Sequence, residues 1–334
     1  MEKHNIPIIM MFDDNYAIPA GVAIYSLLEN SDKNHNYLLF IMHNNITEKH
    51  INKLNIIVEK FSNAKLEFIQ MNNYLKDFDM QYYPAEVLYK FFVPEVFVQY
   101  KTAIITDVDV VFKGDISKEY IDFLNDTENY FAGVKQAQYP IHPNFSRNIQ
   151  DNNSHSIVGA GYMIYNLQKM REDKIPEKCL EYYKKYQVYC IYPEQDVINQ
   201  ICYPKIKLLH PKSMTLTSWY KYKNYMHSFY YCATVKEIEE AIQNPVQLHY
   251  VISPYGEYLK PWQYPFAPKA DVWWEYICKT PFYDEAFDNF KNSIIKKEKL
   301  NFIQTIFSIK NSQDKKHKII TILGIKIKIK RKNK

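Results

Sequence analysis

Glycine is scarce in this chain, with seven residues among 334. Neither GxGxxG nor GxxxxGK followed by serine or threonine occurs. Such glycine-rich loops cradle the phosphates of dinucleotide-dependent dehydrogenases and P-loop kinases with backbone amides. The sequence therefore argues against both classes. A phosphate group that binds here must be neutralised by a metal ion or by side chains.

Cysteine is also sparse, and the chain lacks the features of a secreted or membrane-spanning protein. The five cysteines are widely spaced without a CxxC pair, which predicts reduced thiols in a cytosolic compartment. The apolar run at residues 6–12 begins near the start and turns acidic at Asp13, unlike a signal peptide. No stretch approaches the roughly 20 apolar residues of a bilayer span, so we expect a soluble or peripheral protein. The cysteines are Cys179, Cys190, Cys202, Cys232 and Cys278.

The composition is that of a folded globular protein, with 47% hydrophobic and 24% charged residues. A chain of this length can bury a sizeable core. It has no linker rich in proline, glycine and serine, and no internal repeat at a solenoid period. We predict one main domain at residues 1–265, a helical segment at 266–309 and a basic, isoleucine-rich tail at 310–334.

The tail carries much of the positive charge of a chain whose formal net charge is +5. Its isoleucines alternate in part with lysines, as in a strand. Such a segment can lie on an anionic membrane surface. A solvated tail or a small hairpin explains the same pattern equally well. Beyond Lys310, the basic residues of the tail include Lys315, Lys316, Lys318, Lys326, Lys328, Lys330, Arg331, Lys332 and Lys334.

Strand and helix patterns alternate in the first part of the chain. Residues 6–12, 37–42 and 66–71 are short apolar runs typical of buried strands. Pro19 suits the first turn of a helix, and Thr47 suits the N-cap of another. The order predicts βαβ units and a doubly wound, mostly parallel sheet, with ligands bound beyond the carboxyl ends of its strands.

Further elements continue the α/β pattern. We predict a helix at residues 87–100, strands at 102–106 and 159–165, and a helix at 194–201 that opens with acidic residues. Beyond about residue 255 the pattern becomes irregular and aromatic-rich.

Asp107-Val108-Asp109 is the sharpest local signal because apolar strand residues flank it on both sides. Carboxylates are hard oxygen ligands that suit Mg²⁺ or Mn²⁺, whose remaining ligands are often water and phosphate oxygens. Two aspartates at the end of a buried strand are costly without such a partner. A solvated turn is the alternative.

Three other candidates are ambiguous by themselves. His249 follows an apolar stretch and could add an imidazole ligand, although a lone histidine is more often structural. Lys260 precedes Pro261-Trp262 and could be an ordinary surface lysine. The carboxylates of Glu194-Gln195-Asp196 could simply offset the dipole of the helix that they open.

Taken in order, these segments resemble glycosyltransferase family 8, which includes bacterial lipopolysaccharide galactosyl- and glucosyltransferases and the glycogenins. The resemblance spans roughly residues 6–262. Each motif is short, but the series in family order is far more specific than any one of them. The motifs are Ile8-Ile9-Met10-Met11-Phe12-Asp13-Asp14-Asn15-Tyr16, Leu88-Tyr89-Lys90-Phe91, Ile104-Ile105-Thr106-Asp107-Val108-Asp109-Val110, Gly161-Tyr162-Met163-Ile164-Tyr165-Asn166-Leu167, Glu194-Gln195-Asp196-Val197-Ile198-Asn199, His249-Tyr250 and Lys260-Pro261-Trp262.

The resemblance implies a GT-A fold and a UDP-sugar donor transferred with retention of anomeric configuration. By the same resemblance, the cofactor is Mn²⁺, with Mg²⁺ as the alternative, and Glu194 and Gln195 flank the reacting face of the donor sugar as catalytic residues. The other implied roles are nucleotide binding by Met11, Asp13, Asn15 and Tyr16, metal binding by Asp107, Asp109 and His249, and donor sugar or diphosphate binding by Lys90, Asp107 and Lys260.

Three departures from the family pattern leave the donor sugar open between glucose, galactose and others. Residues 251–259 lengthen the segment between His249 and Lys260. Members often have an asparagine before the Ala/Ser-Gly of the third motif, whereas this sequence reads Val158-Gly159-Ala160-Gly161. Gln136 stands near a common aspartate position.

The leading hypothesis is transfer of a hexose to a cell-surface glycan or glycolipid acceptor, such as lipopolysaccharide, at the cytoplasmic face of the inner membrane. A non-catalytic sugar-nucleotide-binding or scaffold protein on the same fold is the alternative. Self-glucosylation on tyrosine is a minor variant. We expect no nucleic-acid partner, because the central region carries many acidic residues and no recognised module.

Overall fold

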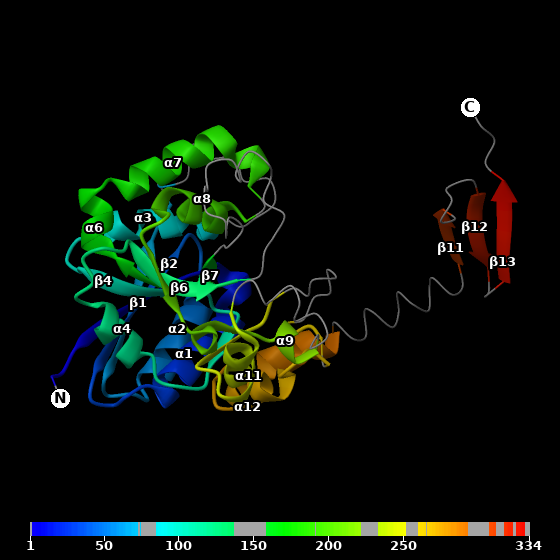
Figure 1. The fold of residues 1–334 in the computed structure, drawn as a ribbon. Helices are drawn as coiled ribbons and strands as arrows, with labels where there is room; N and C mark the ends of the chain where they lie inside the picture. The colour runs from blue at the N-terminus through cyan, green and yellow to red at the C-terminus, as the bar shows by residue number, and fades with distance from the viewer. Residues whose placement is uncertain are drawn as a thin grey trace. The chain divides into compact units, whose positions relative to one another are not determined.

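The computed structural model describes two compact units, Met1–Tyr283 and Asp284–Lys334, each considered by itself (Figure 1). The described residues are 2–72, 74, 85–136, 158–190, 192–221, 233–251, 260–264 and 266–292, together with the backbone of 307–311, 317–322 and 325–330.

A seven-stranded sheet forms the centre of the first unit, in the order β3-β2-β1-β4-β7-β6-β8. The first four of these strands are mutually parallel, whereas β7 runs antiparallel to β4 and β6. The predicted mostly parallel α/β sheet is therefore confirmed. The strands are β1 (Asn5–Met11), β2 (Asn36–His43), β3 (Ala64–Gln70), β4 (Thr102–Thr106), β6 (Phe131–Lys135), β7 (Val158–Asn166) and β8 (Ile206–Leu209).

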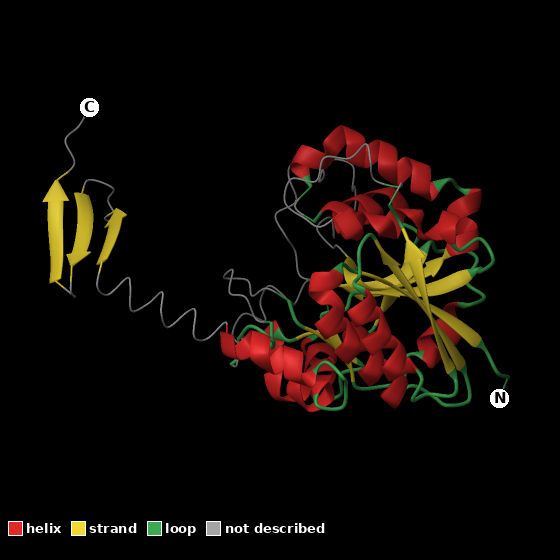
Figure 2. Cartoon of the chain, turned by 180° about the vertical axis from the view of Figure 1, so that it is seen from behind, coloured by secondary structure: helices red, strands yellow, loops and turns green. Residues whose placement is uncertain are grey.

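Helices cover both faces of this sheet (Figures 1 and 2). On one side α3 (Tyr89–Val96), α6 (Leu167–Glu172), α7 (Ile175–Tyr186) and α8 (Pro193–Cys202) pack together, and α1 (Ala17–Asn30) and α2 (Glu48–Val58) pack on the other. Alternate strand residues such as Ile9 and Ile105 join helix residues such as Phe91 and Val197 in one buried cluster. Burial of this apolar surface is the main force that holds the layers together.

The helix predicted at residues 87–100 is shorter than expected. A 3₁₀ turn, η2 (Ala85–Leu88), leads into α3, which ends at Val96. Pro94 lies inside α3 and has no backbone N–H to donate to the preceding turn, which weakens the helix near its end. The N-cap predicted at Thr47 is confirmed, because its side chain accepts from the His50 amide.

A second, three-stranded sheet brings distant segments together beside the first. Its order is β5-β10-β9, and β10 pairs antiparallel with β5 so that His249 lies opposite Val110. The remaining elements of the first unit are β5 (Val110–Phe112), β9 (Thr215–Leu216), β10 (Gln247–His249), α4 (Ser117–Phe123), α9 (Ser218–Lys221), α11 (Val235–Gln243), α12 (Ala270–Ile277), η1 (Asp14–Tyr16), η3 (Gln187–Tyr189) and η4 (Pro211–Met214).

The second unit contains an antiparallel sheet of β11 (Phe307–Asn311), β12 (His317–Ile322) and β13 (Ile325–Lys330). Cross-strand partners share a face of a sheet. The register therefore places Ile309, Ile320 and Ile327 on one face, and Lys310, Ile319 and Lys328 on the other. In the part of the chain that the structure describes, no helix combines the length and the hydrophobicity of a membrane span.

Candidate active site

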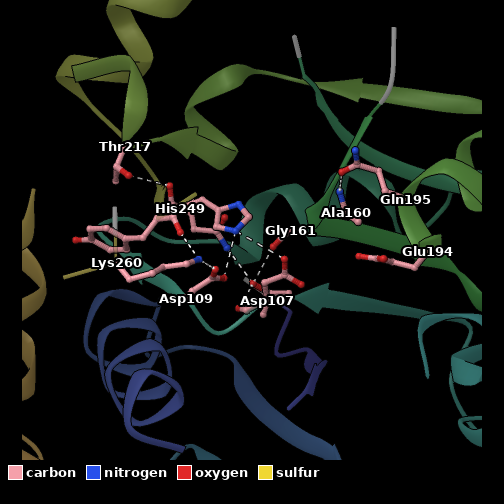
Figure 3. A network of polar contacts seen from close by, with 12 residues as sticks. Asp107, Asp109, Ala160, Gly161, Glu194, Gln195, Thr217, His249 and Lys260 are labelled. Carbon is pink, nitrogen blue, oxygen red and sulfur yellow. Dashed lines mark hydrogen bonds and ion pairs between the residues drawn. The ribbon is translucent and has the colours of Figure 1, made fainter. Parts of the chain in front are cut away.

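Asp107 and Asp109 follow directly on β4, at the carboxyl edge of the central sheet (Figure 3). All of β4 is buried, and the Asp107 amide donates to the Gly161 carbonyl at 3.1 Å, which ties the turn to β7. The Asp109 carbonyl accepts from the Tyr250 amide at 2.9 Å, which ties the same turn to the chain after β10. The two carboxylates thus stand where two sheets meet.

His249 completes this group. Its Nε2 lies 3.2 Å from Asp109 Oδ1 and 3.7 Å from Asp107 Oδ2. Its carbonyl accepts from the Thr217 amide at 3.0 Å and from the Thr217 hydroxyl at 3.2 Å. A Cβ added to Gly161 would lie 2.3 Å from His249 Cε1, so glycine is required beside the imidazole. Thr217 therefore fixes the backbone of His249, and Gly161 leaves room for its ring.

Asp107, Asp109 and His249 form a candidate metal site. One ligand atom from each lies within 4.8 Å of the others. The His249 Nδ1 is buried without a hydrogen-bond partner. Packing and the contacts of Nε2 with the two carboxylates therefore set the position of the ring. Two carboxylates and one imidazole are a donor set that suits a divalent cation such as Mn²⁺. The residues present therefore fit the metal that the sequence motif predicted.

Lys260 neutralises the Asp109 side of the site. Its Nζ binds Asp109 Oδ2 and the Tyr250 carbonyl, and its side chain is buried. Burial alone would raise the pKa of Asp109, but the Lys260 ammonium and the contact with His249 outweigh it and hold that pKa far below its usual range. Asp109 is therefore an anion at neutral pH.

Lys90 neutralises the Asp107 side from α3. Its Nζ donates to Asp107 Oδ1 at 2.8 Å and to the Ala160 carbonyl at 3.0 Å, and lies 3.5 Å from Glu194 Oε1. Burial alone would lower the pKa of Lys90, but the two carboxylates reverse this and raise it. A buried ammonium with two anionic neighbours stays charged, and leaving it unpaired would be strongly destabilising.

Glu194 and Gln195 lie in the first turn of α8, where Gln195 meets Ala160 of β7 (Figure 3). Glu194 also faces Lys90. Burial raises the pKa of Glu194 and outweighs the opposing charge of Lys90. The Gln195 Oε1 accepts from the Ala160 amide at 3.0 Å, and its Nε2 is buried without a hydrogen-bond partner. Asp196 accepts from the Tyr192 amide at 3.0 Å and so satisfies a backbone donor at the N-terminus of α8. Glu194 faces Lys90 instead.

The residues predicted to bind the nucleotide lie beyond β1, on the same edge of the sheet. Met11 ends β1, and Asp13 caps η1 by accepting from the Asn15 amide at 3.1 Å and from its side chain at 2.7 Å. The Tyr16 ring meets Trp262 edge-on at 6.1 Å, and Lys260 Nζ lies 5.9 Å from the same Trp262 ring. The loop after β1 is thus linked to the segment that carries Lys260.

Sequence patterns missed several supports of this site. Gly161 opens one of the family motifs, but nothing in the sequence indicates that it packs against His249. The bonds of Thr217 to His249, and of the Ala160 peptide to Lys90 and Gln195, likewise have no local signature. Gln136 is buried, and its amide packs where a Cβ on residue 159 would stand. Most of the lengthened segment after His249, residues 252–259, lies outside the described residues.

Comparisons with known proteins identify the family and the fold. The family model described as glycosyl transferase family 8 matches residues 7–265. A Haemophilus influenzae protein provisionally named as a glycosyltransferase is 25% identical over 211 residues, 61% of either chain. The lipopolysaccharide 1,2-glucosyltransferase of Escherichia coli is 22% identical over 230 residues, 67% of either chain.

Solved structures share the fold. The bifunctional glycosyltransferase WbbM superposes with a TM-score of 0.71 at 23% identity, covering 85% of this chain and 51% of that protein. This chain therefore spans about half the length of WbbM. The galactosyltransferase LgtC with donor and acceptor sugar analogues superposes with a TM-score of 0.66 at 16% identity, covering 83% and 96%. The protein has the GT-A fold, and its chain belongs to glycosyltransferase family 8.

Proposed function

We propose that this protein is a metal-dependent, retaining glycosyltransferase that takes a hexose from a UDP-sugar. The observation that carries the proposal is the convergence of Asp107, Asp109 and His249 at the carboxyl edge of a family 8 fold. The metal would be Mn²⁺ or Mg²⁺, held by these three side chains, and it would supply electrostatic stabilisation of the donor diphosphate.

The two buried lysines would support departure of the nucleotide. Cleavage of the bond between the anomeric carbon and UDP builds negative charge on the leaving phosphate. Lys260 is paired with Asp109, and Lys90 is paired with Asp107. We infer that their ammonium groups stabilise the developing charge, in a site where burial strengthens each electrostatic interaction.

Glu194 and Gln195 would act on the sugar. An oxocarbenium-like anomeric centre needs nearby carboxylate or amide oxygen, by analogy with glycoside hydrolysis. Glu194 stands next to Lys90 and Asp107, and Gln195 is pinned to the backbone of β7. We assign these two residues to the reacting face of the donor, while Met11, Asp13, Asn15 and Tyr16 would bind uracil and ribose.

The acceptor would be a cell-surface glycan or glycolipid. The Escherichia coli relative acts on lipopolysaccharide by its name, which supports the same acceptor class here. We infer that the second unit holds the enzyme at an anionic membrane surface on the cytoplasmic side. In β13 (Ile325–Lys330) isoleucine and lysine alternate strictly, so their positions fall on opposite faces of that strand, a pattern typical of elements that lie in a membrane interface.

The first experiment is UDP release from a panel of UDP-hexoses, with and without Mn²⁺, for the wild type and Asp109→Ala. We expect metal-dependent turnover of one donor and a loss of at least about 100-fold in the variant, because one of the two metal-binding carboxylates is gone. Asp126→Ala, at the amino edge of the sheet, is the control and should keep full turnover. Absence of donor binding and turnover, even with acceptors supplied, would favour a non-catalytic scaffold.

Contact with the membrane has a separate test. Removal of residues 310–334 should reduce co-sedimentation with liposomes that contain anionic lipid, because both the basic charge and the apolar strand positions are lost. UDP release by the shortened protein from a soluble acceptor should stay unchanged. Undiminished liposome binding would remove this part of the proposal.

A further inference from the structure

Asp14 lies inside the loop predicted to bind the nucleotide, yet its contacts lead away from the donor site. Its Oδ1 accepts from the Thr47 amide at 2.8 Å, the Thr47 hydroxyl at 3.0 Å and the His50 ring Nδ1 at 2.7 Å. These donors belong to the N-terminus of α2, which Thr47 caps. Asp14 therefore fastens the loop after β1 to the helix that follows β2.

The bond pattern favours a charged Asp14. Burial acts to raise the pKa of Asp14, but the hydrogen bonds from Thr47 and His50 outweigh it and lower that pKa. A carboxylate at the start of a helix also interacts favourably with the helix dipole. Hydrogen bonds to a charged group are stronger than neutral ones. The hydrogen bonds of Asp14 with Thr47 and His50 are thus among the stronger polar contacts of this loop.

The neighbours of Asp14 in this loop also bond to one another. Asp13 and Asn15 bond chiefly to each other, and the Tyr16 amide donates back to the Asp13 carbonyl at 3.0 Å. Tyr16 meets Trp262 through a ring contact. Among the hydrogen bonds recorded for the described residues, those of Asp14 join this turn to α2.

We propose that Asp14 is a positioning residue for donor binding: by fastening residues 13–16 to Thr47 and His50, it sets the affinity for the nucleotide. This inference rests on the proposed function, because it assumes that Asp13, Asn15 and Tyr16 bind UDP. A loop that is already ordered loses less conformational freedom when the ligand binds. Loosening it should therefore weaken binding without removing any group that touches the nucleotide.

Asp115 provides a matched control elsewhere in the fold. Its carboxylate accepts from the Asp32 amide at 3.0 Å, the Ser117 amide at 3.1 Å and the Ser117 hydroxyl at 2.5 Å. It joins the segment after β5 to the segment after α1, away from the metal-binding residues. The two aspartates thus make similar sets of bonds in different places. Loss of either should destabilise the protein to a similar degree.

The test measures the Kd of UDP with Mn²⁺ by calorimetry, and Tm, for Asp14→Ala, Asp115→Ala, His50→Ala and His50→Asn. Both aspartate variants should lower Tm by a few degrees. Asp14→Ala should weaken UDP binding by about 10- to 100-fold, as for loss of a group that orients ligand-binding residues. His50→Ala should weaken it less, and His50→Asn, which can still donate from the same position, should recover most of the affinity.

Hydrogen exchange of the ligand-free protein gives a second readout. Amides of residues 15–17 should exchange faster in Asp14→Ala than in Asp115→Ala. Unchanged UDP affinity in Asp14→Ala, alongside a lower Tm, would overturn the positioning role and leave the proposed function intact. A wild type that binds no UDP would instead overturn the proposed function, and this inference with it.

Discussion

Aspartates at the carboxyl edge of the central sheet and aspartates elsewhere in the first unit are satisfied by different partners. Near β4, Asp109 faces Lys260 and His249, and Lys260 comes from a segment 151 residues away in the chain. Asp126, near the amino end of the same sheet, accepts from the Glu128 amide at 3.0 Å and the Asn129 amide at 2.8 Å. Asp109 is thus paired with buried charged side chains, whereas Asp126 bonds to local amides, with the Lys207 ammonium 3.9 Å away.

This difference separates binding sites from structural caps. A backbone amide within three residues satisfies a carboxylate wherever the turn forms, and it cannot leave to meet a ligand. A lysine ammonium can shift between a carboxylate and an incoming phosphate, because it is a point charge on a flexible stem. The carboxyl edge is therefore suited to exchange partners when a nucleotide enters, and the amino edge is not.

The largest expected effect comes from removing the charged partner. Lys260→Met should reduce turnover of the donor by about 100-fold or more, because one cation facing the leaving phosphate is lost and Asp109 keeps an uncompensated charge. Lys207→Met, which removes a lysine 3.9 Å from Asp126, should leave turnover unchanged. Steady-state UDP release measures both. Equal losses of turnover in the two variants would contradict the proposed difference between the carboxyl and amino edges of the sheet.

A smaller effect is expected from crowding the imidazole. A methyl group on Gly161 would lie 2.3 Å from His249 Cε1, and one on Gly133 would lie 2.4 Å from Val158 Cγ1. Both substitutions to alanine should lower the free energy of unfolding by about 1–3 kcal/mol through overpacking. Only Gly161→Ala should weaken Mn²⁺ binding, by about tenfold, because it would displace His249, the imidazole that we propose as a metal ligand.

Calorimetric titration with Mn²⁺ and urea denaturation of both glycine variants separate these effects. If Gly133→Ala weakened Mn²⁺ binding as much as Gly161→Ala, general loss of packing, rather than displacement of His249, would explain the result.

The smallest expected effect is a pH dependence at the amino edge. Burial acts to raise the pKa of Asp126, but hydrogen bonds from Asn129 and Glu128 outweigh it and lower that pKa. Its contribution to stability is therefore present above the unfolded-state pKa of about 3.9 and is lost as the pH falls through the lower folded-state value. Asp126→Asn should be less stable than the wild type at pH 7, and the gap should narrow near pH 3.

Urea unfolding at the two pH values measures this gap, which should stay below about 1 kcal/mol for a partly exposed group. If the difference in free energy of unfolding between the wild type and Asp126→Asn were larger at pH 3 than at pH 7, the charged form of Asp126 would be destabilising.

Much of the architecture could be predicted because its signals are local. The apolar runs ending at Phe12 and Thr106 mark strands, and both end in acidic turns that the parallel pairing of β1 and β4 brings to one edge. Those patterns were sufficient for the α/β class and for Asp107 and Asp109 as the candidate metal ligands. Where one residue changes the outcome, as Pro94 does near the end of α3, the boundary was missed.

Roles that depend on distant partners could not be derived from spacing. Spacing alone left His249 ambiguous, and the pairing of β10 with β5 is what brings its ring to Asp107 and Asp109. Glu194 faces Lys90 while Asp196 serves the helix terminus, a division that no helical pattern distinguishes. Asp14 looks like its neighbour Asp13, but its contacts lead to α2.

Periodicity and the placement of acidic residues are properties of neighbouring positions, so the chain alone specified the layers of the fold and the edge at which ligands should bind. Which partner each charged side chain has depends on the tertiary structure. Strand register and burial decide which distant ammonium or imidazole comes within reach of a carboxylate, and the high cost of an unpaired buried charge then makes that pairing necessary.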